Sequence, residues 1–232
     1  MRQLFITIAF LLSGLTHSVA QQSLNNSWQV GLGLGELPIG GSLKPSITLG
    51  YHFNEHLYVG VIYQTADKIK RDKSSFNVKA SELSQLTQAK EDVAQRLLVQ
   101  CRYTPVRYAP YISLGFVYNG SDVETMNFAP ANRIINGNTY NGDLQITQTR
   151  KAGSGLAIGI GYQYNFNNGL SINAEWTPAW FTPIPTPEYS FSGTTILSSQ
   201  DKQFIKDKMT DGFKSSVTNR YKVFHIGVAY HF

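Results

Sequence analysis

Seven polar residues hold most of the chemistry that this sequence could place inside a folded chain. Each lies in a segment where large apolar side chains alternate with small or polar ones, so it belongs to the face opposite the apolar side chains. They are Arg96, Gln100, Arg102, Gln163, Asn173, Glu175 and His225. An unpaired buried charge is costly. We therefore predict that Glu175 pairs with Arg102 or Arg96, either as a structural plug or as a polar gate or ligand contact.

Catalysis needs a different arrangement from the one that these residues offer. A serine hydrolase requires Ser and His side by side with an acid that orients the His. The strand histidines, His52, His225 and His231, show no His-x-Ser arrangement at the outer end of a strand, and no cluster of metal ligands is visible. We expect no catalytic residues, no metal and no cofactor, and an enzyme is the less favoured alternative.

Eight segments must form strands to position these residues. The alternation is clearest where Leu156, Ile158 and Ile160 oppose Gly155 and Gly159. A soluble barrel would expose the large apolar side chains to water, whereas a membrane barrel turns them toward lipid. We predict an all-β fold, an eight-stranded antiparallel up-and-down transmembrane barrel. Its strands are residues 27–34, 46–53, 57–64, 96–104, 109–119, 153–166, 170–177 and 221–232.

Composition agrees with an exported membrane barrel of one domain. The 232 residues include 20 Gly, 13 Tyr and 13 Phe but only 15% charged residues, and the one cysteine excludes an internal disulfide. Residues 1–20 read as a secretory signal peptide, with Arg2, an apolar stretch over residues 4–15, and a small-x-small site that ends at Ala20. Residues 21–232 are then the barrel domain. Despite the net charge of +5, export argues against nucleic acid as a partner.

The connections between strands fall into two classes. Those after the second, fourth and sixth strands are short, whereas long insertions occupy residues 65–95, 120–151 and 178–218. This asymmetry is typical of barrels with short periplasmic turns and long extracellular loops, and it puts both termini at the short-turn rim. Helical spacing predicts short helices over residues 81–93 and 200–209. Pro178 and the prolines that follow it predict the end of the seventh strand's ladder.

The C-terminal strand carries a resemblance to a known group. It reads YKVFHIGVAYHF and resembles the last strand of bacterial outer-membrane proteins, which implies that Tyr230 and Phe232 are an assembly signal for the barrel-assembly machinery. The run RYAPYISLG at residues 107–115 and the Asn-Asn-Gly turn at residues 167–169 are similar to small outer-membrane barrels of the OmpW and OmpA type. OmpW-like is the first choice, and the OmpA transmembrane domain is the second.

This resemblance implies a location and a function. The location is the outer membrane, with its lipid and lipopolysaccharide as partners and a monomer as the expected state. The function is a narrow channel for small molecules, hydrophobic ones included, that leave sideways into the membrane, or a structural membrane component.

The alternative is a surface-interaction protein whose basic loops bind lipopolysaccharide or host surfaces. Its candidate residues are Lys68, Lys70, Arg71, Lys73, Arg150, Lys151, Lys202, Lys206 and Lys208. Solvated loops without a partner would show the same clusters.

Overall fold

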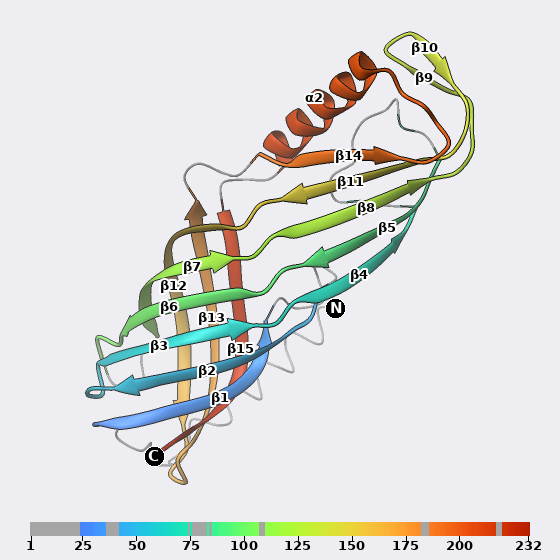
Figure 1. Ribbon diagram of the computed structural model, residues 1–232. Helices are drawn as coiled ribbons and strands as arrows, with labels where there is room; N and C mark the ends of the chain where they lie inside the picture. Colours follow the sequence, from blue (N-terminus) through green and yellow to red (C-terminus); the bar gives the residue numbers. More distant parts are fainter. Residues whose placement is uncertain are drawn as a thin grey trace, which may run out of the picture.

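Eight antiparallel strands close into a barrel in this computed structural model, which describes residues 24–35, 42–73, 75, 83, 85–106, 110–181, 186–216 and 220–232. The order around the barrel is β1-β15-β13-β12-β7-β6-β3-β2, so strands that follow one another along the chain are neighbours and β15 closes on β1 (Figure 1). The strands are β1 (Ser27–Gly35), β2 (Lys44–His52), β3 (Leu57–Gln64), β6 (Arg96–Tyr103), β7 (Tyr111–Asn119), β12 (Gly153–Asn165), β13 (Leu170–Phe181) and β15 (Arg220–His231).

The fold prediction is confirmed, including the direction of the side chains. Outward positions are open, with Leu32 69%, Leu114 61% and Leu156 65% exposed, while their inward neighbours are buried or nearly so. An exposed apolar belt of this kind is stable only against lipid. The predicted signal peptide, residues 1–20, lies outside the described residues, as do residues 107–109 of the middle-strand motif.

Local hydrogen bonds account for the short turns. The Asn54 side chain accepts the backbone N–H groups of His56 and Leu57, at 2.8 and 2.9 Å, and so closes the turn between β2 and β3. Gly169 has a φ of +84°, which favours glycine, and its carbonyl accepts the backbone N–H of His231. The C-terminus therefore lies at the short-turn rim.

Beyond the opposite rim, four barrel strands, β3, β6, β7 and β12, continue into a second sheet of five strands. It consists of β4 (Asp67–Asp72), β5 (Leu86–Val93), β8 (Asp122–Phe128), β11 (Leu144–Arg150) and β14 (Glu188–Ser192), in the order β14-β11-β8-β5-β4. Figure 1 shows β4, β5, β8 and β11 running on from the barrel wall. A hairpin of β9 (Arg133–Ile135) and β10 (Asn138–Tyr140) and the helix α2 (Ser199–Ser216) complete what we call the distal module.

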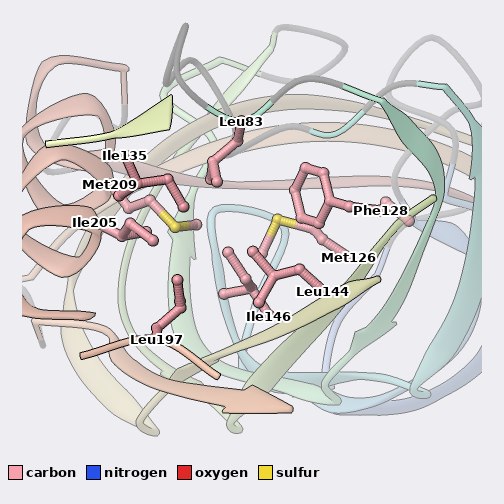
Figure 2. Packing of buried hydrophobic residues seen from close by; sticks show 10 residues of the cluster. Leu83, Met126, Phe128, Ile135, Leu144, Ile146, Leu197, Ile205 and Met209 are labelled. Atoms are coloured by element: carbon pink, nitrogen blue, oxygen red, sulfur yellow. The ribbon is translucent and has the colours of Figure 1, made fainter. Parts of the chain in front are cut away.

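The distal module has an apolar core of its own, between the inner face of its sheet, the hairpin and α2. Figure 2 shows its side chains, which come from all three parts. The cluster contains Leu83, Ala89, Met126, Phe128, Ile135, Leu144, Ile146, Leu197, Ile205 and Met209. Helix α2 confirms and lengthens the helix predicted over residues 200–209. Of the helices in the described residues, none is long and apolar enough to cross a membrane.

The helix predicted over residues 81–93 is wrong, because Leu86–Val93 form strand β5. The register between β5 and β8 shifts between Leu86 and Gln88. Such an irregularity changes which face the following side chains take. Leu86, Ala89 and Val93 therefore point to one side although they are three and four residues apart, a spacing that imitates a helix. The segment forms a strand and not a helix because its backbone pairs with β4 on one edge and with β8 on the other.

The predicted end of the seventh strand at Pro178 is also wrong. β13 continues to Phe181, and Pro178 lies opposite Lys222 of β15. On the β12 side, Trp176 pairs with Ile160 and Ala179 with Ala157 in one register. Proline removes one donor from a ladder. The ladder here resumes beyond that gap because the neighbours on both sides hold the strand in place.

Candidate functional site

Glu175 is the centre of the polar network inside the barrel. Its Oε2 accepts hydrogen bonds from Arg102 Nη2 at 2.7 Å and from Gln100 Nε2 at 3.0 Å. Its Oε1 accepts from Ser113 Oγ at 3.1 Å and Thr177 Oγ1 at 2.6 Å. The predicted pairing of Glu175 with one of two arginines is thus found with Arg102. A carboxylate held by several donors and a guanidinium is a strong, directional arrangement.

Two tyrosines complete this Glu175 cluster. Tyr111 donates its hydroxyl to Glu175 Oε2 at 3.0 Å. The Arg102 guanidinium carbon lies 4.6 Å from the ring centre of Tyr58 and 4.7 Å from that of Tyr111. Cation–π contact compensates part of the cost of burying the charge. The side chains of both members of the ion pair are at most 3% exposed.

Glycines make the room that these tyrosines occupy. A Cβ on Gly50 or Gly60 would lie 2.2 Å from the Tyr58 hydroxyl oxygen, and one on Gly161 would lie 2.3 Å from the Tyr111 hydroxyl oxygen. Any larger residue at these inward positions would displace a ring. The small residues read from the sequence therefore leave room for the aromatic rings of the lumen.

An apolar layer crosses the lumen between the Glu175 cluster and the distal module. Leu98 is the next inward residue above Gln100 on β6, and Ala179 lies above Thr177 on β13. All members of the layer are at most 1% exposed. They are Ile62, Leu98, Val117, Ala157, Ala179 and Val223. Hydrocarbon from six of the eight strands therefore packs together at this level, while β1 and β2 contribute no member.

A second polar group lies above the apolar layer, where barrel strands become distal strands. Arg96 donates to Asn119 Oδ1 at 2.5 Å, and Asn119 Nδ2 donates to Asp122 Oδ2 at 3.3 Å. Asp122 also accepts the backbone N–H of Ala94 and pairs with Arg150. These contacts fix the junction between the barrel and the distal module. Arg96 is thus separated from Glu175 by the apolar layer.

The remaining predicted residues are inward but do not join the Glu175 cluster. Gln163 donates to Asn165 Oδ1 at 2.8 Å, near the short-turn rim. His225 Nδ1 lies 2.9 Å from Ser46 Oγ. Asn173 is 1% exposed, and its side chain has no hydrogen-bond partner among the described residues. Of the seven candidates, only Gln100, Arg102 and Glu175 come together.

The predicted set lacked the three hydroxyl donors of the Glu175 cluster, Tyr111, Ser113 and Thr177, and it lacked Tyr58, whose ring packs on Arg102. Tyr58, Tyr111, Ser113 and Thr177 all fall on the inward face by simple alternation. That alternation was the signal that could have found them. Alternation could not predict which inward residues lie at the same height in the lumen, because that height depends on the stagger between neighbouring strands.

Two Ser–His pairs lie in the lumen, although the sequence separates their members widely. Ser46 Oγ meets His225 Nδ1, and Ser171 Oγ meets His231 Nε2, both at 2.9 Å. Both serines are at most 2% exposed, so a substrate has no access to them. His231 Nδ1 has no partner among the described residues, and the partners of Glu175 described above are residues other than histidine. A nucleophilic triad needs an acid on the second ring nitrogen.

A third polar cluster joins the hairpin to α2 in the distal module. The Asp201 carboxylate accepts hydrogen bonds from Tyr140 Oη at 2.5 Å, Ser198 Oγ at 2.8 Å, Asn138 Nδ2 at 3.0 Å and Asn136 Nδ2 at 3.1 Å. These hydrogen bonds lower the pKa of the Asp201 carboxyl to about 2, and the bond from Tyr140 has the largest effect. Asp201 also takes part in the N-cap of α2, where its N–H donates to Ser198 Oγ. This carboxylate therefore locks the hairpin to the helix.

The last aromatic residues lie on the lipid-facing side at the short-turn rim. Tyr230 is 47% and Phe232 67% exposed, and their ring centres are 6.4 Å apart. The backbone of Phe232 exchanges two hydrogen bonds with that of Trp28, so the last residue helps to close the barrel.

Known proteins match this architecture. A profile of the outer membrane protein beta-barrel domain covers residues 7–232. The chain belongs to this outer membrane β-barrel family. The protein is therefore an outer membrane protein, and eight of its described strands form the barrel.

Two solved structures share the fold. CarO of Acinetobacter baumannii has a TM-score of 0.53 and 13% identity, and the match covers 88% of this chain and 97% of CarO. CarO2 of Acinetobacter baumannii has a TM-score of 0.53 and 13% identity, and the match covers 91% of this chain and 100% of CarO2. A major outer membrane protein from Thermus thermophilus gives a lower TM-score of 0.45 at 14% identity, with 89% and 98% covered. No curated protein matches the sequence.

Proposed function

We propose that this outer membrane barrel is closed and that its working part is the distal module at the cell surface. The observation that carries the proposal is the apolar layer across the lumen, whose members are at most 1% exposed. Ions and polar solutes lose their hydration at such a level and gain no polar contacts in return. The Glu175 cluster below it is a second, charged obstruction. The barrel then anchors a packed sheet and helix above the membrane.

Planar-bilayer recording tests the closed lumen. The refolded wild-type chain is expected to insert without discrete current steps. A double variant, Ile62→Ala with Leu98→Ala, removes the two largest side chains of the layer and is expected to give small steps. Val99→Ala, on the lipid face of the same strand, is the matched control and should stay silent. Steps from the wild type that equal those of the double variant would contradict the proposal.

The competing proposal is the narrow channel that the OmpW-type resemblance implies. The apolar layer favours this channel in one respect, because such a layer excludes ions but does not exclude small apolar molecules. Uptake of an apolar dye into proteoliposomes separates the two. The closed-barrel proposal predicts the same rate with and without the protein, whereas a protein-dependent rate that falls in a Leu98→Trp variant would favour the channel.

We also infer that Tyr230 and Phe232 serve as the assembly signal that the C-terminal resemblance implies. Their exposure on the outer surface of β15 leaves both rings accessible before the barrel closes. Replacing Phe232 by Ala is expected to slow assembly in cells while leaving the folded barrel heat-modifiable.

A further inference from the structure

The outer face of the distal sheet carries one continuous row of lysine and hydroxyl side chains. Lys70 lies opposite Lys90, Lys90 opposite Thr125, Thr125 opposite Thr147, and Thr147 opposite Ser190. Their neighbours Ala89, Met126 and Ile146 point into the apolar core on the other side. The row, which we call the Lys–Thr row, thus runs across all five strands from β4 to β14.

Two like charges face each other at one end of this row. Lys70 and Lys90 are directly cross-strand and exposed, and neither has an ion-pair partner among the described residues. Like charges in this position destabilise a sheet. Of the two acids beside the pair, Asp92 pairs with Lys68 at 3.8 Å, and Asp72 forms no ion pair with either lysine among the described residues. An external anion between the two ammonium groups would resolve the opposition.

The hydroxyl part of the row is also free to bind. No side-chain hydrogen bond of Thr125, Thr147 or Ser190 occurs within the part of the chain that the structure describes. The next row of the same face, one step farther from the barrel, is different. Gln145 Nε2 donates to Asn127 Oδ1 at 2.8 Å, and Ser192 Oγ donates to Gln145 Oε1 at 2.9 Å. The Lys–Thr row therefore offers unused donors and acceptors beside two lysines that form no ion pair among the described residues.

The height of the Lys–Thr row above the membrane indicates which part of the surrounding outer leaflet it can contact. The outer face of the distal sheet continues the lipid-facing side of the barrel. Lys70 follows Tyr63, the last outward aromatic residue of β3, by seven residues. At about 3.3 Å per residue and a tilt of about 45°, the row lies roughly 16 Å above that aromatic level. This is the region of head groups and sugars, beyond the acyl chains.

We propose that the Lys–Thr row docks the phosphorylated core saccharide of lipopolysaccharide in the surrounding outer leaflet. Lys70 and Lys90 hold one phosphate between them, and the threonine and serine hydroxyls bind the sugar hydroxyls beside it. Lysine suits a phosphate as a compact point charge with three donors. The proposal rests on the distal module being the working part of the protein, and it assigns a partner and a surface to that part.

Charge reversal with a matched control tests the docking surface. The probe is a truncated lipopolysaccharide that retains its core phosphates, titrated into the refolded full chain in neutral nanodiscs, with the dephosphorylated form beside it. Lys70→Glu with Lys90→Glu should weaken binding of the phosphorylated form at least tenfold. Lys208→Glu with Lys214→Glu makes the same charge change on α2 and should change it less than twofold. Equal binding by all variants, or an equal loss in both double variants, would overturn the proposal.

The single variant Lys70→Glu separates binding from stability. It replaces the lysine pair by a glutamate–lysine pair, so the thermal midpoint should stay level or rise while lipopolysaccharide binding falls. Retained binding in this variant, or a loss that occurs only with a lower midpoint, would count against the docking surface. Neither readout depends on ion flow through the lumen, so failure here is distinguishable from failure of the closed-barrel proposal.

Discussion

At the residue scale, the molecule depends on carboxylates that collect many donors. Glu175 in the lumen and Asp201 in the distal module each bind donors from two or more elements. Sequence alternation was sufficient to place Glu175 inward and to pair it with one of two arginines. It gave no hint of Asp201, whose partners come from a hairpin some sixty residues away in the chain.

Replacing Glu175 by Gln should destabilise the barrel by about 3–5 kcal/mol, because it leaves the Arg102 charge buried without its counter-ion. Urea unfolding in lipid vesicles measures the change in the free energy of unfolding. Thr177→Val removes only one donor to the same carboxylate and should cost about 1 kcal/mol. A glutamine variant no less stable than the valine variant would mean that the ion pair does not hold the lumen together.

Acidification should release the hairpin from α2. The pKa of Asp201 is lowered to about 2 in the folded state, so its contribution is complete above the usual carboxyl pKa of about 4. That contribution is lost as the pH falls through about 2. Amide hydrogen exchange at β9, β10 and the first turn of α2 should rise across this window, after correction for intrinsic rates. Asp201→Asn should show raised exchange already at neutral pH and no such transition. Wild-type protection that persists below pH 2 would contradict the assignment.

At the element scale, the two faces of each barrel strand were predictable, whereas the secondary structure of the long insertions was not. The period of two fixed the eight barrel strands because every outward position meets lipid. In residues 65–95, the local spacing of apolar residues favoured a helix. A register shift and pairing on both edges made β5 instead. Pro178 likewise failed to end β13, because neighbouring strands hold the chain on both sides. Such long-range pairing is not visible in a local pattern.

A charge on the lipid face should be costly near the middle of the belt and tolerated at its edge. Leu114→Arg or Ile158→Arg should destabilise the barrel by about 2–4 kcal/mol, and Ser154→Arg, outward on β12 near the upper rim, by about 0–1 kcal/mol. Urea titration in vesicles of fixed acyl length gives these values. Equal costs at all three positions would argue against a bilayer around the apolar belt.

At the scale of the whole molecule, one chain builds a barrel and a distal module, and four barrel strands continue into the sheet of that module. The barrel class, the strand count and the rim asymmetry followed from composition, alternation and connection length. The apolar layer in the lumen did not, because its six members are ordinary small or aliphatic residues in the sequence. Only the stagger of the closed barrel brings Leu98, Val117 and Val223 to one level.

Thiol labelling of a residue in this layer tests the sealed lumen most directly. Leu98→Cys is made with Cys101→Ser, which removes the native thiol, and the refolded protein in vesicles is treated with a charged, membrane-impermeant reagent. Thr125→Cys in the same background reports access at the surface. A sealed lumen predicts rapid labelling at position 125 and none at position 98 until the barrel is denatured. Labelling at position 98 at a rate close to that at position 125 would mean that water and ions reach the layer and that the barrel is open.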